Sequence, residues 1–144
     1  MQSSVIARTA LGSGLAGMRS HGDPRLVELR ELPPEAMVDL RLNPADAAAL
    51  SAAERTLSLK LPLTPGTSVR AADGAALWFG PDQWLLIAPS AGAASLVRAL
   101  DGAGASAVDV SDLRAVFELT GPHAADVLRK GCAIDLHQIG RAHV

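Results

Sequence analysis

The sequence predicts an α+β fold in which an antiparallel sheet carries helices on one face. Residues 37–42 alternate apolar and polar side chains, as a half-buried strand does. Residues 75–79 and 84–88 are two apolar runs joined by Gly-Pro-Asp-Gln, which indicates a hairpin. Two alanine-rich segments with helical spacing, 44–55 and 91–100, complete the element order of the split βαβ, or ferredoxin-like, fold.

The part of the chain before this pattern has little periodicity. Residues 1–24 are rich in Ser, Gly and Ala, so we expect them to form a flexible N-terminal arm. The apolar residues between Leu26 and Leu32 predict a short strand that ends at Pro33-Pro34.

The first helix is predicted from its N-terminal signal. Asn43 is a favourable N-cap, and Pro44 suits the first helical position because the N–H that it lacks has no helical partner there. The helix should extend to Arg55. It is expected to bury the apolar residues Ala47, Leu50 and either Ala53 or Leu57.

A second strand is predicted over Leu57–Leu63, where leucines alternate with Ser58, Lys60 and Pro62. Pro62 favours a sheet edge or an early end, because proline lacks the donor that a central strand needs.

The hairpin and the second helix should form the core. At least one of Trp78 and Trp84, which flank the hairpin loop, is expected on the helix-covered face. Leu96, Val97 and Leu100 should face inward from the helix.

The last predicted elements are strands over 107–110 and 115–119 and a helix over His123–Lys130, ended by Gly131. This helix is expected to bury the apolar residues Ala124, Val127 and Leu128.

Composition excludes several classes of protein. The net charge of -2 and the scattered basic residues do not suit a nucleic-acid partner. The longest apolar run, Trp84–Ala88, is too short to span a membrane, and the arm makes a poor signal peptide, so we predict a cytoplasmic protein. A single cysteine, Cys132, permits neither an internal disulfide nor a cysteine-based zinc site.

Candidate chemical groups are few. Gly12–Gly17 matches the dinucleotide pattern G-x-G-x-x-G, but a weak strand precedes it and no helix follows, so we interpret it as part of the arm. Cys132 lacks a base at a useful spacing and is expected to be buried and inert. The histidines show no metal-site spacing; they are His21, His123, His137 and His143.

A polar cluster lies between the last two strands and comprises Asp109, Ser111, Asp112 and Arg114. Asp and Ser there could be catalytic, but they are also common turn residues. We favour a turn, with Arg114 in a subunit contact.

Several segments resemble the gamma subunits of heterotetrameric sarcosine oxidase. Residues 76–86 (ALWFGPDQWLL) are similar to that family's LWLGPDEW-type segment. Residues 108–111 and 119–122 follow at suitable distances, and 131–137 (GCAIDLH) resemble the family's GC-x-x-DLH segment. The resemblance covers about residues 25–138.

The resemblance implies a function. Gamma subunits look like shortened relatives of the glycine-cleavage T-protein, so residues 115–130 should begin a second, T-protein-like β-α element. The parent enzyme would oxidatively demethylate sarcosine to glycine, with tetrahydrofolate capturing the one-carbon unit and release of hydrogen peroxide. FAD, FMN, NAD, zinc and tetrahydrofolate would be bound by the alpha, beta and delta subunits, and this chain would hold no catalytic, cofactor-binding or metal-ligating residue.

The resemblance also sets the expected domain limits. Residues 25–138 would form a gamma-like domain that is incomplete at its C-terminus. Residues 139–144 (IGRAHV) correspond to the translation of a common sequencing adapter, and we predict that they are a non-native tail.

The favoured function is a non-catalytic structural and assembly subunit of sarcosine oxidase. A free-standing, folate-binding protein of the aminomethyltransferase type is the alternative, and a binding module outside any complex is a weaker third. Co-purification with flavin-bearing subunits would discriminate between them.

Overall fold

The computed structural model describes residues 20–23, 25–32, 35–72, 74–88 and 92–133. The chain divides into two compact units. Residues 34–114 form the first, here called the central unit, and residues 1–33 with 115–144 form the second, the flanking unit. The Gly12–Gly17 motif and the predicted tail lie outside the described residues.

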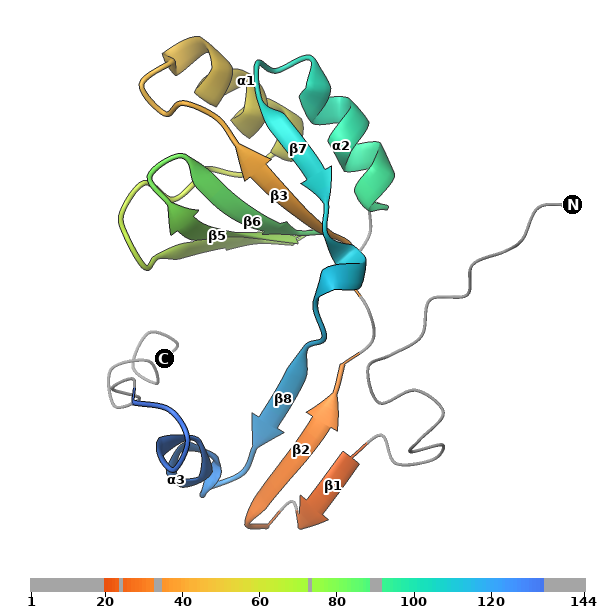
Figure 1. The fold of residues 1–144 in the computed structure, drawn as a ribbon, viewed down its shortest axis with the longest axis vertical. Coiled ribbons are helices and arrows are strands. Elements are labelled where there is room, and N and C mark those ends of the chain that lie inside the picture. Colours follow the sequence, from red (N-terminus) through yellow and green to blue (C-terminus); the bar gives the residue numbers. More distant parts are fainter. Residues whose placement is uncertain (1–19, 24, 33–34, 73, 89–91, 134–144) are drawn as a thin grey trace, which may run out of the picture. The chain divides into compact units, whose positions relative to one another are not determined.

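The central unit contains a five-stranded antiparallel sheet with the order β4-β5-β6-β3-β7 (Figure 1). Its strands are β3 (Met37–Arg41), β4 (Ser68–Ala71), β5 (Gly74–Gly80), β6 (Gln83–Ile87) and β7 (Ser106–Asp109). Helix α1 (Ala47–Leu57) follows β3, and α2 (Ala93–Asp101) joins β6 to β7. Apart from the edge strand β4, this is the ferredoxin-like order, so the predicted fold class is confirmed.

The core of the central unit lies between the sheet and both helices. The register pairs Leu40 with Trp84 and Val38 with Leu86, which places these four side chains on one face. Leu100 of α2 packs in the same buried cluster, as does Ala53 of α1, so both helices cover one face as predicted. Trp84 is fully buried there, and its indole N–H donates to the carbonyl of Pro62 at 2.7 Å.

Helix α1 starts later than predicted. Asp46, and not Asn43, is its N-cap, with Oδ1 accepting the N–H groups of Ala48 and Ala49, each at 3.0 Å. Asn43 instead bonds the N–H of Ala45 in a preceding turn. Ala47, the first helical residue, is exposed, whereas Ala49 and Ala53 are buried, so the expected burial of Ala47 is wrong.

The predicted strand over Leu57–Leu63 is also wrong. Leu57 is the last residue of α1, and Ser58 ends the helix in a left-handed conformation with φ 50°. The following segment is irregular, and the carboxylate of Glu54 accepts the N–H of Leu61. Leu61 is buried and its neighbour Lys60 is exposed, as the alternation predicts, but Pro62 is buried and Leu63 is 56% exposed, so the alternation does not continue to the end of the segment.

The flanking unit contains a three-stranded antiparallel sheet with the order β1-β2-β8, followed by α3. Its elements are β1 (Ser20–Asp23), β2 (Val27–Glu31), β8 (Phe117–Thr120) and α3 (Ala124–Arg129). The strand β1 lies within the segment expected to be an arm, whereas β2, β8 and α3 match predicted elements. Val127 and Leu128 are 42% and 44% exposed, so their expected burial is wrong. Ala124 and Ala125, in contrast, are half-buried.

Candidate functional site

The predicted polar cluster forms a tight turn at the end of β7. The hydroxyl of Ser111 donates to Oδ1 of Asp109 at 2.6 Å, and the backbone N–H of Ser111 donates to the same oxygen at 3.0 Å. The Ser111 oxygen accepts the backbone N–H of Met37, also at 3.0 Å. These bonds fix the short 3₁₀ helix η2 (Ser111–Leu113) against the start of β3.

The contacts of Ser111 are those of a turn. Its two hydrogen bonds favour the charged carboxylate of Asp109 and lower the pKa of that group. The pair thereby stabilises the turn after β7. Arg114, from the same cluster, places its guanidinium carbon 5.6 Å from the ring centroid of Phe79.

The other candidate residues lie apart from this turn in the sequence. At the start of α3, Nδ1 of the N-cap residue His123 is 3.2 Å from Oδ2 of Asp126, and this hydrogen bond is the main cause of a lowered Asp126 pKa. Cys132 is half-buried, less than expected, and its N–H bonds the carbonyl of Leu128. His137 and His143 lie outside the described residues.

The described residues offer neither a cluster of metal ligands nor a membrane-spanning helix. They contain no group of three or more His, Cys, Asp or Glu side chains arranged to hold a metal ion. None of the helices in the described part of the chain has the length and apolar character needed to cross a membrane.

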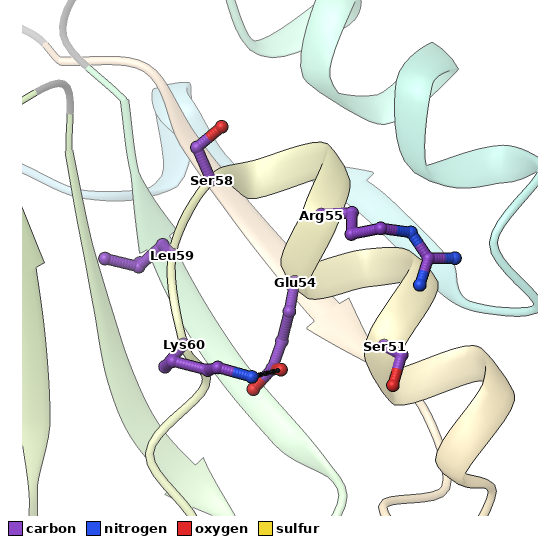
Figure 2. A pocket seen from close by; sticks show the side chains of 6 residues that line it. All are labelled: Ser51, Glu54, Arg55, Ser58, Leu59 and Lys60. Atoms are coloured by element: carbon purple, nitrogen blue, oxygen red, sulfur yellow. Dashed lines mark hydrogen bonds and ion pairs between the residues drawn. The ribbon is translucent and has the colours of Figure 1, made fainter.

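A pocket of about 360 Å³ lies at the C-terminal end of α1. It is lined by Ser51, Glu54, Arg55, Ser58, Leu59 and Lys60. Figure 2 shows the Lys60 ammonium directed at Glu54, whereas the Arg55 guanidinium points away from this pair. The two cations therefore do not converge on one ligand, and the adjacent helix end presents carbonyl groups that disfavour an anion.

Glu54 links helix α1 to the irregular segment that follows it. Its Oε2 lies 2.6 Å from Nζ of Lys60, and its Oε1 accepts the N–H of Leu61 at 3.1 Å. Burial alone would raise the pKa of Glu54, but the bonds from Lys60 and Leu61 outweigh burial and lower it. Sequence reasoning missed this residue, because the pairing depends on the chain reversal at Ser58.

The lowered pKa of Glu54 predicts a pH dependence of stability. The charged carboxylate stabilises the fold above the ordinary Glu pKa of 4.5, and this contribution is lost as the pH falls through the lower folded-state value. We expect Glu54→Gln to reduce the acid dependence of the unfolding free energy, measured by urea titrations between about pH 6 and pH 3. The matched control is Glu35→Gln; equal acid dependence in wild type and Glu54→Gln would contradict the assignment.

Known proteins with similar sequences identify the family of this chain. A family model described as "Sarcosine oxidase, gamma subunit family" matches residues 41–142. Sarcosine oxidase subunit gamma of Arthrobacter sp is 46% identical over 116 residues, and that of Corynebacterium sp. (strain P-1) is 40% identical over 114. Each alignment covers 77% of this chain and 56% of the relative, so the chain spans little more than half the length of these relatives.

A solved structure is also similar. A chain of heterotetrameric sarcosine oxidase from Corynebacterium sp. U-96, in complex with pyrrole 2-carboxylate, superposes with a TM-score of 0.77 at 33% identity. The likeness covers 92% of this chain and 70% of that chain. Together with the family match over residues 41–142, it shows that this chain belongs to the sarcosine oxidase gamma subunit family.

Proposed function

We propose that this chain acts as a non-catalytic structural and assembly subunit of a heterotetrameric sarcosine oxidase. The observation that carries the proposal is the similarity to a chain of that heterotetramer, at 33% identity over 92% of this chain. The conserved fold would place this subunit in a comparable assembly.

The described polar side chains support the same proposal. Asp46 caps α1, Ser111 and Asp109 fix a turn, and Glu54 ties an irregular segment to its helix. Each of these groups forms hydrogen bonds that hold the fold together, which is the role expected of polar side chains in a structural subunit.

The proposal includes the chemistry of the whole enzyme. Alpha, beta and delta subunits would be the partners and would bind FAD, FMN, NAD, zinc and tetrahydrofolate. The assembly would oxidise sarcosine to glycine in the cytoplasm, pass the one-carbon unit to tetrahydrofolate and release hydrogen peroxide. The alternative, a free-standing folate-binding protein of the aminomethyltransferase type, has no specific observation in its favour.

Co-purification tests this proposal. The full-length protein, with an affinity tag, is expressed alone and together with the alpha, beta and delta subunits from the same source. We expect the tagged chain to retain flavin-bearing subunits and sarcosine oxidase activity in the second case. Alone, it should be colourless and should not turn over sarcosine. Elution as a single chain from the co-expression, or folate binding and turnover by the isolated chain, would contradict the proposal.

A further inference from the structure

The central sheet has a second face, on the side opposite α1 and α2, here called the open face. It is defined by residues that alternate with the core residues along each strand. The register aligns Leu77 of β5, Leu85 of β6, Asp39 of β3 and Val108 of β7 in one row across this face. A neighbouring row aligns Arg70, Ala75, Ile87 and Met37.

The open face is more apolar than a water-facing sheet surface. Antiparallel sheets with one solvated face alternate apolar and polar residues, but β6 places Trp84 and Leu86 on the core side and Leu85 and Ile87 on the open side. On this face Met37 and Leu85 are already buried within the chain, whereas Val108 is 57% exposed and Phe79, at the bulge opposite Gln83, is 45% exposed. Such a surface is typical of a sheet that is covered on both faces.

Arginines surround these apolar residues. Arg41 and Arg70 belong to the open face by register, and Arg114 reaches it through the ring of Phe79. All three are exposed, and within the described part of the chain none of them forms an ion pair with a carboxylate. Arginine beside aromatic and aliphatic side chains is the composition that protein interfaces favour.

The acidic residue of the open face does not neutralise these arginines. Asp39 accepts the side-chain amide of Gln83 on Oδ2 at 2.7 Å, and Arg41 donates to the amide oxygen of the same Gln83 at 3.1 Å. Oδ1 of Asp39 is buried and has no hydrogen-bond partner among the described residues. The polar groups on the face therefore leave positive charge available to an incoming surface.

Charge decides between the possible occupants. A second copy of this chain would bring arginines against arginines, which is unfavourable. In the flanking unit, three of the described carboxylates, those of Asp23, Glu118 and Asp126, already contact Arg25, Arg30 and Arg129 respectively, so these three are not available to the arginines of the open face.

We propose that the open face binds another subunit of the oxidase, through a surface of that subunit that combines apolar side chains with carboxylates facing Arg41, Arg70 and Arg114. This inference rests on the proposed function, since it requires the heterotetramer. The contact would cover Phe79 and Val108 and place each arginine at its rim, where charge pairs direct association.

The first test introduces a photo-crosslinking amino acid at Phe79 of the full-length protein, co-expressed with the other subunits. We expect irradiation of the purified complex to join this chain to another subunit. A crosslink to the flanking unit of the same chain, or to a second copy, would overturn the proposal. If the complex co-purifies and no crosslink forms, the proposal also fails while the proposed function stands. If the wild-type chain does not co-purify, the proposed function fails and this inference with it.

The second test reverses one charge. Arg70→Glu is expected to weaken retention of the other subunits by about tenfold in 0.15 M salt, with a smaller difference from wild type at 1 M salt. Arg98→Glu, on the exposed side of α2, is the matched control and should retain them as wild type does. Equal retention by Arg70→Glu and Arg98→Glu, with both variants folded by circular dichroism, would overturn the role of Arg70.

Discussion

Replacing Trp84 with alanine is expected to lower the free energy of unfolding by about 3–5 kcal/mol. Trp84 is the largest fully buried side chain of the central unit, and it packs in the core cluster beside Leu40 and Leu86. Removing the indole leaves a cavity between the sheet and the helices, and the surrounding side chains relax only partly. Its loss also leaves the buried carbonyl of Pro62 without its donor.

Urea titration followed by far-ultraviolet circular dichroism measures this effect. Trp84→Phe keeps most of the apolar volume and removes the hydrogen bond to Pro62, so it should cost less than Trp84→Ala and separate the two contributions. Trp78→Phe, at the half-buried tryptophan of the same hairpin, is the matched control. A loss below about 1 kcal/mol for Trp84→Ala would contradict a close-packed site around this side chain.

Replacing Gly121 with alanine should destabilise the flanking unit by about 2 kcal/mol. Gly121 has φ +104°, a conformation that residues with a Cβ rarely adopt. An added Cβ would lie 2.7 Å from the carbonyl oxygen of Leu26, which accepts the N–H of His123 at 3.0 Å. The substitution therefore disturbs the connection from β8 to α3 as well as the turn before β2.

Amide hydrogen exchange is the appropriate measurement, because both tryptophans lie in the central unit. The loss of about 2 kcal/mol should accelerate exchange in β2 and β8 by roughly thirtyfold, with β3 and β6 unchanged. Gly131→Ala is the control, since a Cβ there meets nothing within 4 Å. Unchanged exchange in β2 and β8 would show that the turn accommodates a side chain.

Local signals predicted the elements whose partners are close in sequence. The hairpin of β5 and β6 is specified by two apolar runs and the turn between them, and the whole hairpin lies within residues 74–87. The N-cap of α1 was predicted at Asn43, but Asp46, three residues later, caps the helix. The leucine alternation after Leu57 indicated burial correctly at Leu61 but carried no information about a sheet partner.

The open face could not be predicted from the sequence, because its residues come from distant parts of the chain. Arg41, Arg70 and Arg114 are far apart in the chain, and no spacing rule connects them. Only the strand register of the first two and the contact of Arg114 with Phe79 bring them to one surface. Arg114 alone was expected to make a subunit contact, because it lies in a polar segment between strands.

A strand that is apolar on both faces, as β6 is, has a consequence for the supply of the protein in a cell. If the open face binds another subunit as proposed, copies made in excess of that subunit would leave Phe79 and Val108 exposed, and chaperones and proteases act on exposed apolar surfaces. Because unbound copies would be degraded, the steady-state amount of this chain would then follow that of its proposed partner subunit, even without coordinated transcription.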